Sequence, residues 1–267
     1  ALAIKARFKL MSSAWLSSFF LASEAVEALK TCLQTDPNNK DVLFGLGVFD
    51  YYTARLSGVL KFLTYILLHK GDKEEGLRKL HTAAQEARFS SLEAKSMLLH
   101  IYLFLEEDFE KALKLVSELF TGYSRNPRFA VLRGVCLIRL DRTDEYRGTL
   151  EEIRNRARAA ASTQAADTWQ RRVAYLESIR ALYERRYEAA RRNLEAILRF
   201  SDAENDPTMV AWPLVKLGMS YHLEGNKDAA RKYYDKVLEM ENGAGAQFLA
   251  QRLLEADPAK DDAFIGY

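Results

Sequence analysis

Histidine and cysteine are the side chains of this chain whose chemistry would first suggest metal binding or nucleophilic catalysis. The chain has four histidines and two cysteines, which are His69, His81, His100, His222, Cys32 and Cys136. None of the histidines pairs with another at helical spacing, and the cysteines form no CxxC pair. Metal ligands recur at short fixed spacings, so we predict no metal site. We expect both cysteines to behave as small buried apolar side chains.

The acidic cluster Glu106-Glu107-Asp108 is the nearest approach to a paired-carboxylate site. It stands at a predicted turn between two helices, where Asp108 could cap the helix that begins at Phe109. The sequence contains no glycine-rich phosphate loop, no nucleophile elbow and no HExxH motif. We therefore predict no catalytic residue, no cofactor and no enzymatic activity.

The composition indicates helices and argues against two classes of partner. Nearly half of the residues are hydrophobic, and the 267 residues include only 13 Gly and 5 Pro, which is unlike a turn-rich β protein. The 39 basic and 37 acidic side chains nearly balance, so no strongly basic surface predicts nucleic-acid binding. The longest apolar run, 59–68, is too short for a transmembrane span and contains Lys61.

A repeat is clearest in residues 211–242. Gly218 and Ala230 are small, as two helices that cross closely require, and Gly225-Asn226 supplies a turn that tolerates left-handed backbone. Aromatic and apolar residues surround these positions at fixed intervals: Leu214, Leu217, Tyr221, Tyr234 and Val237. This spacing resembles that of tetratricopeptide repeats.

Small residues at equivalent positions predict further units along the chain. Those positions are Ala25, Gly47, Gly76, Ala112, Gly134 and Ala190. We predict an all-α fold in which antiparallel helix pairs stack into a right-handed superhelical solenoid. It would comprise about six units in a single domain over residues 1–267, with an inserted apolar helix at about 55–70 and a capping helix at about 244–256. We expect the tail 259–267 to be polar and mobile, apart from its apolar residues Phe264, Ile265 and Tyr267.

A second resemblance rests on residues 45–129. This stretch contains Gly45-Leu46-Gly47, Asp50-Tyr51-Tyr52, the apolar run 59–68, the turn 71–77 that begins Gly71-Asp72, and Asn126-Pro127. It is similar to uncharacterised bacterial tetratricopeptide repeat proteins, often exported, and more distantly to eukaryotic inclusion-body clearance proteins. The resemblance implies an adaptor or scaffold role and brings no catalytic residues. An exported or periplasmic location is favoured over a cytoplasmic one.

The first helix of each unit is expected to line a concave groove that is mostly apolar or aromatic. The candidate partner-binding residues are Tyr51, Tyr52, Phe104, Arg172, Tyr175, Trp212, Met219 and His222. An apolar groove of this kind needs a cover. We expect the inserted helix 59–68 to pack into it, since a helix that is apolar on all sides is normally buried. A peptide or helix of a partner protein is the other predicted cover.

We therefore predict a non-enzymatic scaffold that binds another protein through this groove. One alternative is a structural subunit of a homo-oligomer or fixed complex, with the end of the chain at 264–267 as a contact. A second alternative is a carrier of an apolar ligand. Contact of the run 59–68 with a membrane surface is a further alternative, although Arg55, Lys61, Lys70 and Lys73 give only a thin basic flank.

Overall fold

The computed structural model describes residues 5, 15–55, 71–264 and 266, and the regular structure among these residues is entirely helical. The chain divides into two compact units, residues 1–107 and 108–267. The all-α fold of paired, adjacent helices is confirmed. The course of one right-handed superhelix over a single domain stays a prediction.

Within its described residues, unit 1 contains four helices. They are α2 (Trp15–Thr35), α3 (Val42–Ala54), α5 (Lys73–Glu86) and α6 (Ser91–Phe104). The apolar side chains of Val26, Val42 and Leu46 join α2 to α3. The inserted helix predicted at about 55–70 lies outside the described residues, apart from Arg55 at the end of α3.

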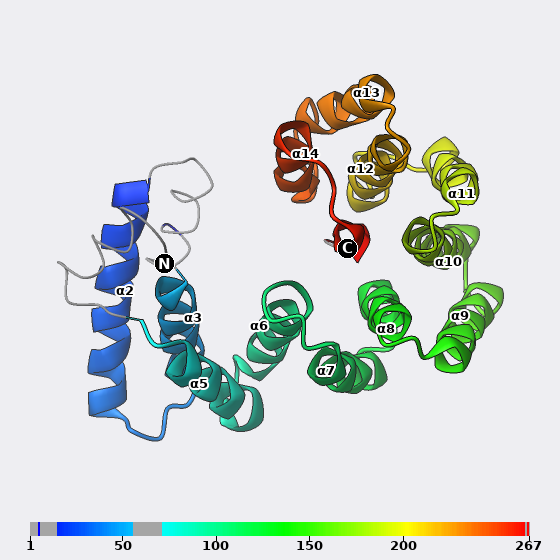
Figure 1. The fold of residues 1–267 in the computed structure, drawn as a ribbon. Helices are drawn as coiled ribbons and strands as arrows, with labels where there is room; N and C mark the ends of the chain where they lie inside the picture. Colours follow the sequence, from blue (N-terminus) through cyan, green and yellow to red (C-terminus); the bar gives the residue numbers. More distant parts are fainter. Residues whose placement is uncertain (1–4, 6–14, 56–70, 265, 267) are drawn as a thin grey trace. The chain divides into compact units, whose positions relative to one another are not determined.

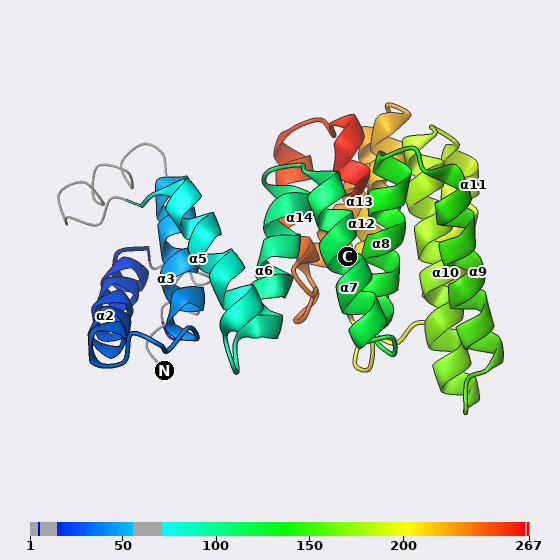
Figure 2. The ribbon, with the colours of Figure 1, turned by 90° about the horizontal axis from the view of Figure 1, so that it is seen from below.

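Unit 2 contains eight α-helices and one 3-10 helix among its described residues. They are α7 (Phe109–Gly122), α8 (Pro127–Arg139), α9 (Thr143–Arg158), α10 (Thr163–Tyr183), α11 (Tyr187–Arg199), α12 (Thr208–Leu223), α13 (Lys227–Leu238), α14 (Ala246–Glu255) and η1 (Lys260–Phe264). Each helix packs against the next, and Figure 2 shows the axes of neighbouring helices lying side by side. The capping helix predicted at about 244–256 is confirmed as α14.

Side-chain caps explain where five of the described helices begin. In each, an oxygen of an Asp, Asn or Ser side chain accepts a hydrogen bond from a backbone N–H of the first turn, which has no partner within the helix. The capping residues are Asp72, Asp108, Asn126, Ser162 and Asn226. The cap predicted at Asp108 is thereby confirmed.

One backbone conformation recurs in the turns that precede four helices. A residue with positive φ stands two residues before α7, α9, α11 and α13: Glu107, Asp141, Arg185 and Gly225. This conformation reverses the chain within very few residues, and only glycine adopts it without a steric cost. The left-handed turn predicted at Gly225-Asn226 is confirmed, whereas the three turns without glycine were not recognisable from residue type.

The small residues of the repeat allow two helices to cross closely. A Cβ added at Gly76 of α5 would lie 2.6 Å from the backbone nitrogen of Tyr51 and 2.9 Å from the carbonyl oxygen of Gly47, both in α3. A Cβ added at Gly218 of α12 would lie 2.5 Å from the ring of Tyr234 in α13. The close crossing inferred from these small positions is confirmed.

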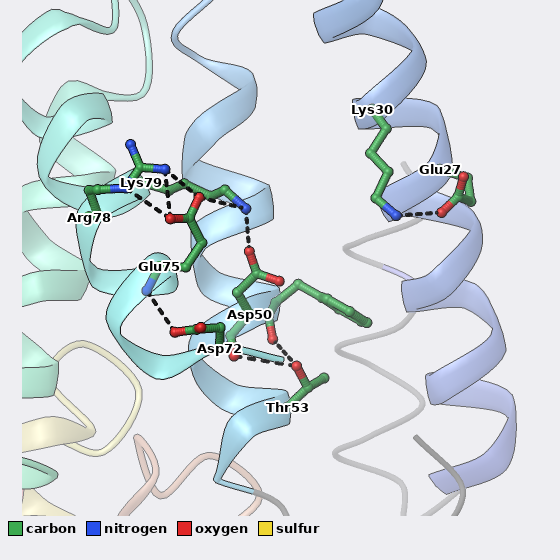
Figure 3. A network of polar contacts seen from close by, with 9 residues as sticks. Glu27, Lys30, Asp50, Thr53, Asp72, Glu75, Arg78 and Lys79 are labelled. Atoms are coloured by element: carbon green, nitrogen blue, oxygen red, sulfur yellow. Dashed lines mark hydrogen bonds and ion pairs between the residues drawn. The ribbon is translucent and has the colours of Figure 1, made fainter. Parts of the chain in front are cut away.

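Polar contacts reinforce the α3–α5 pair, as Figure 3 shows. The amine of Lys79 in α5 lies 2.5 Å from the carboxylate of Asp50 in α3 and 3.4 Å from that of Glu75. Glu75 also pairs with Arg78 at 2.6 Å. The hydrogen bonds from Arg78, and then the charge of Lys79, lower the pKa of the Glu75 carboxyl. The Asp50–Lys79 contact therefore links two helices, while the other pairs stay within α5.

Two expectations for individual segments are wrong. Cys32 is exposed, because it lies on the solvent side of α2, whereas Cys136 is buried as predicted. The tail expected to be mobile forms η1 over Lys260–Phe264, and Asp262 and Ala263 are buried beside Phe264, which the prediction had excepted. The polar composition of this tail concealed the partners that it finds on the helices of unit 2.

Candidate functional site

The first helices of successive pairs in unit 2 stack directly on one another. The helix α10 packs against α8 and α12, and α12 also packs against α14. Nine of the 13 residues of α8 are buried and ten of the 16 of α12, against three of the 13 of the second helix α11. A helix that is covered on nearly every side has neighbours on both sides. Figure 1 shows α8, α10 and α12 along the inside of an arc made by the helices of unit 2.

A segment of the chain itself lies against the inside of this arc. The described residues 257–264 and 266, hereafter the 257–266 segment, follow α14 and return to the stacked helices, as the red end of the ribbon in Figure 1 shows. The surface that receives the segment is hereafter the inner face. Its residues are Arg139 of α8, Tyr183 of α10, Trp212, Lys216 and His222 of α12, and Arg252 of α14.

Lys216 holds the main chain of the segment. Its side chain is fully buried, and its Nζ donates a hydrogen bond of 3.0 Å to the backbone carbonyl oxygen of Asp262. The amine also lies 5.8 Å from the centre of the Trp212 ring. Burial lowers the pKa of Lys216 to about 7, with the nearby Asp262 charge raising it and that of Arg252 lowering it further. Lys216 thus holds the main chain of the segment at Asp262.

The carboxylate of Asp262 makes an ion pair inside the fold. Its Oδ1 lies 2.5 Å from Nη2 of Arg252, and its Oδ2 accepts a hydrogen bond of 2.9 Å from the backbone N–H of Ala259. Because the Asp262 side chain is buried, the guanidinium beside it balances a charge that would be costly alone. The same carboxylate therefore shapes the turn η1 and fastens it to α14.

Phe264 is the apolar anchor of the segment. Its ring is buried and lies 5.0 Å from that of Tyr183 at an interplanar angle of 61°, the edge-to-face arrangement that aromatic pairs favour. The guanidinium of Arg139 lies 5.4 Å from the centre of the same ring. An aromatic side chain at this position therefore contacts two helices of the stack at once.

The two ends of the segment are held differently. The carboxylate of Asp257 lies 3.0 Å from Nε2 of His222 and 2.5 Å from Nζ of Lys227, and both Asp257 and Lys227 are well exposed. Gly266 has a φ of +101°, and a Cβ added there would lie 2.0 Å from the Trp212 ring. The Asp257–Lys227 ion pair joins two exposed groups and contributes little, whereas a Cβ at Gly266 would force the Trp212 ring to shift.

Of the eight predicted partner-binding residues, the structure brings Trp212 and His222 together on the inner face. Tyr175 and Met219 are fully buried among the helices of unit 2. Arg172 is also buried, and its Nη1 pairs with Asp206 at 2.7 Å. In this conformation these three residues build the helix stack instead of offering a surface, because neighbouring helices cover both sides of α10 and α12.

The other three predicted residues belong to unit 1. Tyr51 is fully buried, and its hydroxyl donates a hydrogen bond of 2.5 Å to Glu106, which also pairs with Lys73 at 2.5 Å. Burial raises the pKa of Glu106, but the hydrogen bonds from Lys73 and Tyr51 outweigh it, so the net pKa is lowered. Tyr52 and Phe104 are half-buried. Tyr51 and Glu106 thus act together as a link between α3 and the end of α6.

Sequence reasoning missed four residues of the inner face: Arg139, Tyr183, Lys216 and Arg252. One signal was present, because Lys216 is a single cation within the apolar stretch 209–219 of α12. A lysine among buried neighbours needs a polar partner. The other three residues resemble ordinary surface residues of helix ends, and only the fold shows their proximity.

Among the residues that the structure describes, no cluster of three or more His, Cys, Asp or Glu side chains is placed to hold a metal ion. No helix in the same described ranges is long and apolar enough to cross a membrane.

Comparison with known proteins adds one finding. Residues 213–243, which span most of α12 and all of α13, match the family model described as tetratricopeptide repeat. No curated protein matches the chain. The match covers the unit in which the repeat spacing was clearest, and the similarity to exported bacterial proteins and to inclusion-body clearance proteins stays a prediction.

Proposed function

We propose that the chain is a non-enzymatic scaffold, because residues 213–243 match the tetratricopeptide repeat model and such repeats generally mediate protein–protein interaction. In this proposal, a segment of a partner protein binds on the inner face of unit 2. Stacked helix pairs suit this role because their first helices present a continuous surface to an elongated ligand.

One observation carries the proposal: the inner face already holds a peptide, the 257–266 segment. The face contacts its main chain through Lys216, its carboxylate through Arg252 and its aromatic ring through Tyr183. Peptide recognition commonly combines contacts of these three kinds, because main-chain contacts give affinity and side-chain pockets give specificity. A partner segment would make the same contacts when it replaces the chain's own.

The burial of Tyr175, Met219 and Arg172 changes which residues a test should alter. Replacing a fully buried aromatic residue by alanine costs about 3–5 kcal/mol, so Tyr175→Ala would disturb the helix stack whether or not a partner contacts it. Tyr183 is half-buried at the end of α10 and contacts the segment directly. It is therefore the better position for a probe.

Site-specific photocrosslinking in cells of the source organism tests the proposal. A photoreactive phenylalanine replaces Tyr183 on the inner face, and in a matched control it replaces Phe200, which is 77% exposed at the end of the outer helix α11. Both changes exchange one aromatic side chain for another, and circular dichroism of each purified variant verifies that it is folded.

We expect a protein partner to be crosslinked from position 183 and not from position 200, with the crosslinked peptide identified by mass spectrometry. Crosslinks from position 200 alone would place the partner on the outer helices and contradict the proposal. Crosslinks from position 183 only to a second copy of this chain would instead favour the structural subunit.

A further inference from the structure

We infer that the inner face selects partner segments with the pattern Asp-Ala-Phe-x-Gly, and that the 257–266 segment competes with the partner for that face. The inference rests on the proposed function and specifies the chemistry of the ligand. The bound example of the pattern is residues 262–264 and 266 of the chain itself.

The first and third positions of the pattern follow from charge and shape. Arg252 meets the Asp262 carboxylate at 2.5 Å, so an uncharged residue there would leave a partly covered guanidinium without its counter-charge. Phe264 is buried against Tyr183 and Arg139, whose ring and cation both favour an aromatic partner. An aliphatic side chain would lose both of these contacts.

The second and fifth positions follow from lack of space. Ala263 is 1% exposed, so a larger side chain would have to push packed neighbours apart. Gly266 combines positive φ with a position where any Cβ would overlap the Trp212 ring. The spacing from the carboxylate to the glycine is therefore set by three fixed points on the face: Arg252, Tyr183 and Trp212.

Lys216 favours a peptide-binding role for the inner face over a purely structural one, in which the segment would only cover the apolar core. Burying an amine is costly, and an apolar residue of similar volume would usually seal a core at least as well. Its Nζ instead reaches the backbone carbonyl oxygen of Asp262, a group that every peptide possesses. Lys216 would thus be kept for holding the main chain of whichever segment is bound.

The 257–266 segment is suited to be displaced. The ion pair of Asp257 with Lys227 joins two well-exposed groups and is screened by solvent. The remaining anchors are concentrated in the short helix η1 and Gly266. Because the segment is tethered, its effective concentration at the face is high, and it lowers the apparent affinity for a partner without abolishing it.

A peptide-binding experiment with the full chain tests the inference. The probe is a fluorescent synthetic peptide with the sequence of residues 257–267, and the matched control peptide carries Gly266→Ala. Each peptide is titrated into the wild-type chain and into a full-length Gly266→Ala chain. One added methyl group loosens the chain's own segment there and leaves the receiving residues unchanged. Circular dichroism and light scattering verify that both chains are folded and report their size.

We expect the Gly266→Ala chain to bind the wild-type peptide at least about tenfold more tightly than the wild-type chain does. In the Gly266→Ala chain the inner face is free of the chain's own segment for a larger fraction of the time. The Gly266→Ala peptide should bind that chain at least about tenfold more weakly than the wild-type peptide. A second full-length variant carries Gly266→Ala together with Arg252→Gln. It should bind the wild-type peptide and a peptide with Asp262→Asn equally tightly, whereas the Gly266→Ala chain should prefer the wild-type peptide.

Equal affinity of the two chains, equal affinity of the two peptides, or no binding would each overturn the inference. A wild-type dimer that the peptide dissociates would assign the 257–266 segment to a second copy, which also overturns competition within one chain. If partner crosslinks from position 183 persist while the peptide shows no selectivity, the proposed function stands and only the inferred pattern fails.

Discussion

Gly76 and Gly148 offer a matched pair of substitutions that tests why small residues recur in this chain. Both glycines lie inside helices, α5 and α9. A Cβ at Gly76 would meet the backbone of α3 at 2.6 Å and 2.9 Å, whereas a Cβ at Gly148 would meet nothing within 4 Å. The same change, glycine to alanine, therefore meets a crowded crossing at one position and open space at the other.

The expected effects have opposite signs. Alanine favours a helix over glycine by about 0.5–1 kcal/mol, so Gly148→Ala should raise the free energy of unfolding by about that amount. At Gly76 the same gain is opposed by overpacking, which costs about 1–3 kcal/mol. Because backbone atoms cannot rotate away from the added methyl group, we expect Gly76→Ala to lower the free energy of unfolding by about 1–2 kcal/mol.

Hydrogen exchange resolved by segment is the suitable assay, since a chain of two units need not unfold in one step. For Gly76→Ala, protection should fall in α3 and α5 and stay unchanged in α12 and α13. For Gly148→Ala, protection should rise in α9. Gly76→Ala protein as stable as the wild type, or more stable, would refute the reasoning that helix crossing dictates the small residue.

Three further predictions concern single side chains. Asp72→Ala removes the cap of α5 and should lower the stability of that helix by about 1 kcal/mol, read from hydrogen exchange of its first turn. The pKa of Lys216 is about 7 when the segment covers it, against 10.5 ordinarily. Lys216 therefore binds fewer protons in the covered state, and the segment should be held more tightly as pH rises from about 7 to about 10. Fluorine NMR of fluorinated Phe264 measures how much of the segment is bound, and tighter binding at lower pH would contradict the prediction. Arg172→Met removes the 2.7 Å ion pair of Asp206 and leaves this carboxylate only the longer contact with Arg171 at 3.6 Å; it should cost about 2–3 kcal/mol in urea denaturation, with recovery when Asp206→Asn is added.

The repeat architecture could be predicted because it depends on local residue types at fixed spacing. Two helices can cross closely only where the residue at the crossing is small. Such close crossings are found at Gly47, Gly76 and Gly218. The turns between helices were harder to predict from the sequence. Gly225 indicated a left-handed residue, but Glu107 and Arg185 adopt the same conformation although their side chains do not favour it.

The binding surface could be predicted only in part, because exposure depends on contacts between distant elements. Trp212 and His222 lie on the inner face, which the 257–266 segment occupies, and their binding of a partner stays a prediction. Tyr175 was predicted to line a groove and is instead fully buried. A helix that is apolar on all sides does not show from its sequence which side a ligand could reach.

The most direct test of the account is the nuclear Overhauser effect between the rings of Phe264 and Tyr183 in the intact chain, selectively labelled at both residues. Their centres lie 5.0 Å apart, so we predict a clear effect in the free protein and its loss as the peptide of residues 257–267 saturates the inner face. No effect in the free protein, or an effect that persists when the peptide is bound, would contradict the account.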